Sequence, residues 1–203
     1  IMSLIKTGND FWRKKEKTCK QNDSDNDTKE KKIELYKNNF GALFPFDQEQ
    51  ISHKPTLVED FEKYLEGQWL EDYMFHCIQQ IKDNFSITEL KKSVEAKKDG
   101  RPCELDIIAI KGYQLYLFSC TTSSNIKVVK GKAFEALYRA NQLGGSHARV
   151  VIVSMIANEK KLELEKDLLY FDAKINNKCK LIGFEELLDQ NKLQDKLYEV
   201  FRD

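Results

Sequence analysis

The sequence lacks an excess of charge of either sign. Its 203 residues include 33 lysines and arginines and 33 aspartates and glutamates. No global positive field therefore attracts a polyanion, and any contact with nucleic acid must come from local basic patches.

Paired cysteines and long apolar runs are also missing. The five cysteines are scattered and contain no C-x-x-C, which argues against a zinc knuckle and a disulfide framework. A reducing cytoplasm fits this cysteine usage best. No apolar run approaches the roughly 18 residues of a membrane span, and no signal-peptide pattern opens the sequence.

Hydrophobic residues make up 41% and aromatic residues 11% of the chain, which indicates a globular core. Residues 13–32 contain one cysteine and otherwise only charged or polar side chains. Such a segment cannot bury enough apolar surface to offset chain entropy, so we interpret it as a linker. We interpret residues 1–56 as an N-terminal appendage, the end of a preceding region, and residues 57–203 as one domain.

Periodicity predicts the elements of that domain. Apolar residues at helical spacing predict a helix that ends near residue 82. The predicted strands are 85–94, 104–110, 113–121, 149–155 and one near 181, and the later helices are 131–143, 158–169 and 184–201. This order predicts an α/β fold with a mixed central sheet flanked by helices.

The strand from residue 104 contains two carboxylates at alternating positions. Alternate side chains share a face, so Glu104 and Asp106 project together about 7 Å apart, while Leu105, Ile107 and Ala109 project to the other side. Hard cations such as Mg²⁺ take oxygen ligands, so this pair suits a metal site. An acidic pair on the solvent face of a hairpin is the alternative.

The turn after this strand sets which residues lie beside the carboxylates. A two-residue turn at 111–112 would pair Asp106 with Leu117 and Glu104 with Ser119. Ser119 would then share the acidic face.

Four blocks follow one another within residues 57–156: FEKYLEGQWLEDYMF, ELDIIAIKGYQLYLFSCTT, a helix ending in LGG, and ARVVIVS. They resemble the C-terminal nuclease domain of CRISPR-associated effectors that cyclic oligoadenylate activates. Those effectors carry a nucleotide-sensing CARF domain ahead of a PD-(D/E)xK nuclease. The resemblance implies a restriction-endonuclease-like core and a role in CRISPR-type antiviral defence. The partners that it implies are DNA or RNA, a homodimer mate, and cyclic oligoadenylate bound by a sensor domain outside these residues.

The resemblance assigns roles to three acidic residues. Glu71 matches the acid of the first core helix, Asp106 matches the strand aspartate, and Glu104 is its acidic neighbour. Where the family usually shows E-C-K-T, this chain has S-C-T-T at 119–122, so a carboxylate and a lysine are lost.

Some PD-(D/E)xK enzymes keep serine here and supply the acid from the following helix. Glu135 is the candidate in this sequence, with Lys132 one turn earlier. Residues three or four apart share a helix face, so Lys132, Glu135 and Arg139 form a charged stripe. The alternative is an ordinary surface ion pair.

The mechanism implied is metal-assisted phosphodiester hydrolysis with Mg²⁺ or Mn²⁺. Asp106 and Glu135, with Glu104 or Glu71, would hold the ion, and Lys132 would orient water or stabilise developing charge. Basic residues expected to hold the phosphate backbone are Lys91, Lys92, Lys97, Lys98, Arg101 and Arg139.

Two rival interpretations stay open at this point. One is a catalytically silent PD-(D/E)xK fold that serves nucleic-acid binding or dimerisation, consistent with the departed motif. The other is a purely structural interaction module, which explains the balanced charge but not two carboxylates on one strand face.

Overall fold

A computed structural model describes residues 67–98 and 101–202, except the side chains of Lys98, Arg101 and Asn176. The described elements belong to one compact unit, Gly67–Asp203. The linker predicted at 13–32, and the appendage of 1–56 that contains it, lie outside the described residues.

The core of the unit is a mixed sheet. Its strands are β1 (Ile87–Lys98), β2 (Arg101–Lys111), β3 (Gln114–Thr121), β4 (Arg149–Ser154) and β5 (Cys179–Ile182), in the spatial order β1-β2-β3-β4-β5. The pairs β1–β2 and β2–β3 are antiparallel, whereas β3–β4 and β4–β5 are parallel. The mixed sheet predicted from the sequence is confirmed.

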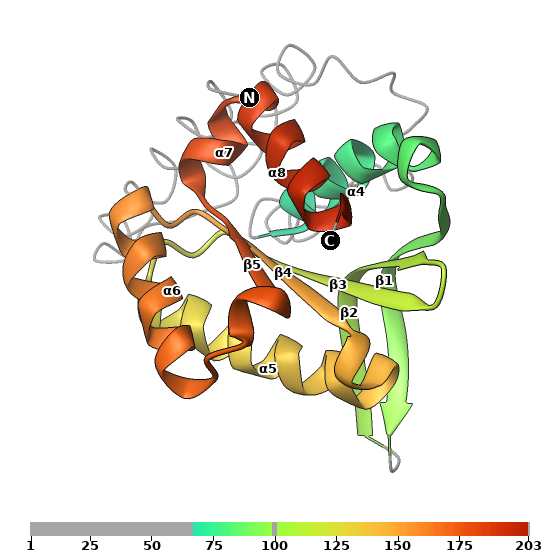
Figure 1. Cartoon of the computed structure of the whole chain (residues 1–203), viewed down its shortest axis with the longest axis horizontal. Coiled ribbons are helices and arrows are strands. Elements are labelled where there is room, and N and C mark those ends of the chain that lie inside the picture. The colour runs from blue at the N-terminus through green and yellow to red at the C-terminus, as the bar shows by residue number, and fades with distance from the viewer. Residues whose placement is uncertain (1–66, 99–100, 203) are drawn as a thin grey trace, which may run out of the picture. The chain divides into compact units, whose positions relative to one another are not determined.

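Helices cover both faces of this sheet. They are α4 (Trp69–Ile81), α5 (Ile126–Gly144), α6 (Asn158–Phe171), α7 (Phe184–Leu188) and α8 (Gln190–Arg202), with 3-10 turns at Asp83–Phe85, Gly145–His147 and Ile175–Asn177. Figure 1 shows α4, α7 and α8 above the sheet and α5 and α6 below it. None of the described helices combines the length and the apolar character that crossing a membrane requires.

Strand β4 contributes to both hydrophobic cores. Val151 and Val153 belong to the cluster on the α4 and α8 side, and Val150 and Ile152 belong to the cluster on the α5 and α6 side. A strand covered on both faces needs apolar side chains at consecutive positions, which explains the uninterrupted run in the sequence.

Helix α5 begins five residues before the predicted start at 131. The side chain of Asn125 accepts a hydrogen bond from the Lys127 N–H at 2.9 Å, which caps the helix. The predicted stop is confirmed: Gly145 has φ 64, and a Cβ on Gly144 would lie 2.8 Å from Leu115 Cβ. Glycine thus lets the end of α5 approach β3 closely.

Two other predicted boundaries are wrong. The predicted final helix, 184–201, divides into α7 and α8 at Asp189, whose Oδ1 accepts from the Asn191 N–H at 3.0 Å and starts a new helix. The predicted strand 85–94 continues to Lys98, because residues 96–98 pair with residues 101–103. The segment between the predicted strands 85–94 and 104–110 is therefore mostly strand.

The turn between β2 and β3 lies one residue later than predicted. Lys111 pairs with Gln114, so the turn is at 112–113, and Gly112 has φ 58. Two-residue hairpins with glycine in the first turn position use this left-handed conformation. The strand register moves by two residues, and an even shift by itself does not move side chains from one face of the sheet to the other.

At Asp106 the side chains of β2 stop alternating regularly between the two faces of the sheet, which the sequence pattern did not predict. Opposite this position Ser93 has φ 50, between the paired residues 92 and 94 of β1. Leu105 packs in the cluster under α5, whereas Ile107 packs in the cluster under α4. The expectation that these two side chains share a face is therefore wrong, because the left-handed residue increases the local twist.

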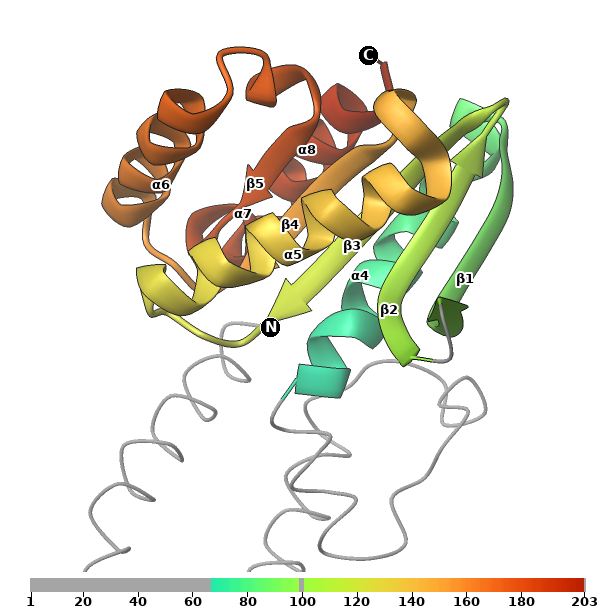
Figure 2. The same cartoon turned by 90° about the horizontal axis from the view of Figure 1, so that it is seen from below.

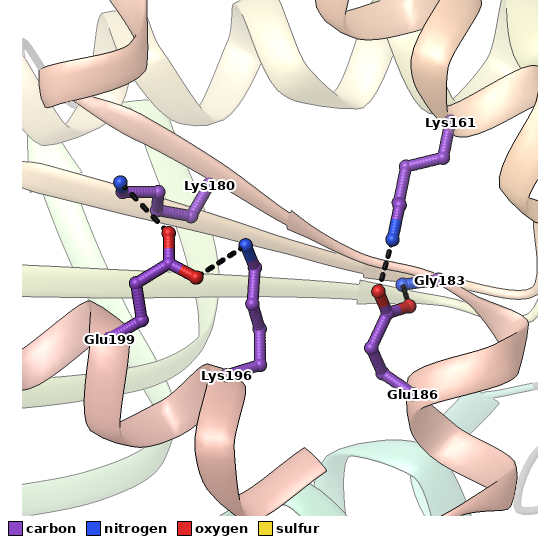
Figure 3. A network of polar contacts seen from close by, with 6 residues as sticks. All are labelled: Lys161, Lys180, Gly183, Glu186, Lys196 and Glu199. Atoms are coloured by element: carbon purple, nitrogen blue, oxygen red, sulfur yellow. Dashed lines mark hydrogen bonds and ion pairs between the residues drawn. The ribbon is translucent and has the colours of Figure 1, made fainter. Parts of the chain in front are cut away.

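Figure 3 shows two ion-pair systems. One joins α6 to α7, and the other joins α8 to β5. Lys161 is 7% exposed and pairs with Glu186, whose other oxygen accepts from the Gly183 N–H at 2.9 Å. Near the surface, Glu199 pairs with Lys180 at 3.1 Å and with Lys196 at 2.7 Å. The buried pair connects α6 to the start of α7.

We predict that Lys161→Met lowers the free energy of unfolding by about 3 kcal/mol, because it leaves the Glu186 carboxylate buried without its cation. Lys196→Met is the matched control and should change stability by at most about 1 kcal/mol, since its pair is solvated. Urea denaturation of both variants gives the two values. Equal, small effects would contradict a structural role for the buried pair.

Candidate active site

A polar hollow of about 250 Å³ lies between α5 and the strands β2 and β3. We call it the acidic hollow. Its lining residues are Glu104, Leu105, Asp106, Leu117, Ser119, Lys132, Glu135, Ala136 and Arg139. The structure thus brings together five residues singled out in the sequence: Glu104, Asp106, Lys132, Glu135 and Arg139.

The carboxylate of Asp106 is held by β3. Its Oδ2 accepts a hydrogen bond from the Cys120 backbone N–H at 2.6 Å and one from Ser119 Oγ at 3.3 Å. Hydrogen bonds to an ionised carboxylate are among the stronger ones in proteins. Sequence reasoning missed the backbone contact because every non-proline residue carries an N–H. The Cys120 side chain is buried on the opposite, core-facing side.

Glu71 enters the same electrostatic environment from the first turn of α4. Burial raises the pKa of its carboxyl from 4.5 to about 7, and Asp106 and Glu104 add to the rise by repulsion. Asp72 raises this pKa further, while the Lys132 ammonium lowers it. Three acidic side chains from α4 and β2 therefore lie near one lysine from α5.

Glu135 and Arg139 form an ion pair on the rim of the hollow. Glu135 Oε1 lies 2.5 Å from an Arg139 nitrogen, and Arg139 Nη1 also donates to the Glu104 carbonyl oxygen at 2.7 Å. The Glu135 side chain is 53% exposed. Arg139 thus ties α5 to β2 directly beside the two strand carboxylates.

Three of the six basic residues predicted to hold a phosphate backbone lie outside the acidic hollow. Lys91 is exposed beside Glu89, Lys92 pairs with Asp72 of α4, and Lys97 is exposed. None of these three lines the acidic hollow. Lys98 and Arg101 are paired in β1 and β2, and their side chains are not described. Arg139, also predicted to hold the phosphate backbone, does line the hollow.

The acidic donors fit a hard divalent cation held by few protein ligands. Within residues 67–98 and 101–202, no three His, Cys, Asp or Glu side chains lie close enough together to hold a metal ion. Mg²⁺ commonly keeps several waters and binds through one or two carboxylates, so Asp106 with Glu104 or Glu71 suffices in kind. Burial contributes most to the raised pKa of Glu71, and the further rise caused by Asp106 and Glu104 is repulsion that a cation would relieve.

Comparison with solved structures shows which fold this is. Can2 from Sulfobacillus thermosulfidooxidans, in complex with cyclic tetra-adenylate, matches with a TM-score of 0.56 and 16% identity over 84% of this chain and 46% of that chain. Protein VC1899 from Vibrio cholerae matches with a TM-score of 0.50 and 20% identity over 72% of this chain and 36% of that one. The present chain thus spans less than half the length of either protein. The predicted restriction-endonuclease-like fold is confirmed.

Sequence comparison identifies the family. No curated protein matches the chain. The family model for the Card1-like endonuclease domain matches residues 58–202, which include every strand of the sheet and every described helix. The chain therefore belongs to the Card1-like endonuclease domain family, of the PD-(D/E)xK type.

Proposed function

We propose that this domain hydrolyses phosphodiester bonds of DNA or RNA with Mg²⁺ or Mn²⁺ as cofactor. The observation that carries the proposal is the acidic hollow, where Glu104, Asp106 and Glu135 lie together with Lys132 and Arg139. Glu71 of α4 does not line the hollow, but burial, and then Asp106 and Glu104, raise its pKa to about 7, and strongly perturbed pKa values are typical of catalytic sites. Membership of an endonuclease family supports the same conclusion.

The proposed roles of the acids follow from their positions. Asp106 would hold the ion with Glu104 or Glu71, since β3 fixes its carboxylate from one side. When bound, the ion would polarise the scissile phosphate and lower the pKa of a water molecule. Glu71, with a pKa of about 7, suits acceptance of a proton from water near neutral pH.

The proposed roles of the cations follow in the same way. Lys132 lines the hollow and would stabilise negative charge that develops on the phosphate. Arg139 is anchored to the Glu104 carbonyl oxygen and would position the strand without reading its bases. Glu135 would supply the carboxylate that β3 lacks at Ser119. To do so, Glu135 would have to leave its ion pair with Arg139 and bind the metal ion instead.

Regulation by a sensor domain is part of the proposal. Can2 is a similar structure in complex with cyclic tetra-adenylate, and the present chain spans 46% of its length. We propose that cyclic oligoadenylate controls this nuclease domain through a sensor domain in CRISPR-type antiviral defence. The homodimer implied by the family resemblance stays a prediction.

A catalytically silent fold is the second candidate. Ser119 occupies the position of the usual strand acid, and Glu135 pairs with Arg139 at 2.5 Å. If that ion pair persists, the hollow holds fewer ligands than an active family member. The domain would then bind nucleic acid or dimerise without cleaving.

We predict that Asp106→Asn lowers the cleavage rate by about 100-fold or more, because it removes ligand charge at constant volume. The melting temperature should stay close to that of the wild type. Cleavage of supercoiled DNA and single-stranded RNA, measured with Mn²⁺ and with a chelator, gives the rates. Asp167→Asn is the control, since Asp167 of α6 pairs with Lys130 of α5 and does not line the hollow. Undiminished cleavage by Asp106→Asn would remove the proposed site.

We predict different effects for two residues of α5. Glu135→Gln should lower Mn²⁺ affinity and cleavage together, because a neutral amide is a poor ligand. Lys132→Met should spare Mn²⁺ affinity and lower kcat, because a lysine beside the phosphate acts on developing charge. Calorimetry gives the affinities and single-turnover kinetics the rates.

Lys130→Met is the matched control for Lys132. Lys130 lies two residues earlier in α5 and pairs with Asp167 at 2.7 Å, away from the hollow. It should affect neither metal binding nor turnover. If Glu135→Gln and Lys132→Met change stability alone, by at most about 1 kcal/mol, the charged stripe is a surface ion pair and the silent fold is favoured.

A further inference from the structure

A second hollow, of about 440 Å³, lies on the same side of the sheet as the acidic hollow. Strands β1, β2 and β3 and the end of α5 form its walls. The side chains that matter here are Val94, Ile108, Ile110, Tyr113, Leu115 and Leu143. Among the residues that the structure describes, no charged side chain lines this apolar hollow. Figure 2 shows the β1–β2 hairpin and α5 that border it.

The apolar hollow adjoins the acidic hollow. Leu105 lines both of them. Asp106 lines the acidic hollow and Ile108 lines the apolar hollow. The two residues are two apart in β2, so their Cα atoms are separated by about 7 Å. A group bound in the apolar hollow would therefore lie next to the Asp106 carboxylate, which we propose lies at the scissile phosphate.

One hollow is charged and the other is apolar, just as a nucleotide has a charged phosphate and an uncharged base. The acidic hollow offers Lys132 and Arg139 to a phosphate. The apolar hollow offers aliphatic walls, and Tyr113 at its edge is fully exposed. A nucleobase has a flat, weakly polar face and no charge, so it suits such walls, whereas a phosphate there would lose its hydration without a partner.

We propose that the apolar hollow is a base subsite, which receives an unstacked nucleobase next to the scissile phosphate. This inference rests on the proposed nuclease function. The base must leave its neighbours to enter a hollow bounded by strand and helix, so contact with the subsite requires a locally unpaired strand. Close packing of Gly144 on Leu115 fixes the α5 wall of the hollow.

The test measures binding of two fluorescent oligomers of equal length to the full chain in a chelating buffer, where cleavage cannot interfere. One is oligo(dT) and the other is its fully abasic counterpart. The wild type should prefer oligo(dT) by about ten-fold, the scale of one buried base. Leu143→Ser should lose most of this preference. Leu143 is 52% exposed, so the substitution should not disturb folding.

Leu162→Ser is the matched control, because Leu162 is 49% exposed on α6 and does not line the apolar hollow. It should keep the preference for oligo(dT). The base subsite is wrong if the wild type shows no preference or no binding, or if Leu143→Ser retains the wild-type preference. It is also wrong if Leu143→Ser instead shifts the oligomeric state in sedimentation, since a second copy would then be the occupant.

Cleavage of oligo(dT) with Mn²⁺ by the same variants separates the two proposals. Cleavage by the wild type together with an unchanged preference in Leu143→Ser would overturn the base subsite and leave the nuclease. No cleavage by the wild type, with or without cyclic tetra-adenylate, together with a preference that Leu143→Ser removes, would overturn the nuclease and leave the subsite supported.

Discussion

The hydrogen bond from the Cys120 backbone N–H to the Asp106 carboxylate is the contact on which the candidate site depends. It joins β2 to β3 at 2.6 Å at the position where β2 changes face. The same carboxylate accepts from Ser119 Oγ, so β3 supplies donors where the family usually supplies another acid. A fixed carboxylate at a twist in the sheet is open to α5 on one side and close to α4 on the other.

Repulsion among carboxylates follows from that fixed position. Asp106 and Glu104 lie close enough to Glu71 to raise its pKa, to which burial contributes most. Bringing like charges together costs free energy unless a cation or a proton neutralises one of them. Lys132 lowers the pKa of Glu71, but less than burial and the neighbouring carboxylates raise it. Such a site is electrostatically prepared for a divalent ion.

The sequence predicted the order of the elements because their periodicities are strong. The apolar run of β4 and the Gly144-Gly145 stop of α5 have direct physical meanings that need no tertiary information. Where a predicted helix boundary was wrong, the cause was a single capping side chain. Asn125 extended α5 and Asp189 divided the last helix, and neither residue type is restricted to caps.

The candidate site was predictable in part. An even register shift left Asp106 and Ser119 on one face, so their proximity survived an incorrect turn. The placement of Leu105 and Ile107 on opposite faces was not predictable from the sequence. It occurs opposite Ser93, which is left-handed, and non-glycine residues seldom adopt this conformation. The pairing of Glu135 with Arg139 depends on tertiary geometry that spacing alone leaves open.

The central claim is that the acids around Asp106 form a cation site, and the titration of Glu71 tests it most directly. Carbon-13 NMR of the glutamate side chains in the full chain, with the resonance assigned through Glu71→Gln, gives the midpoint with and without Mg²⁺. Without Mg²⁺ the pKa of Glu71 should be about 7, and saturating Mg²⁺ should lower it, because an adjacent cation favours the carboxylate. A midpoint that Mg²⁺ leaves unchanged would contradict the account.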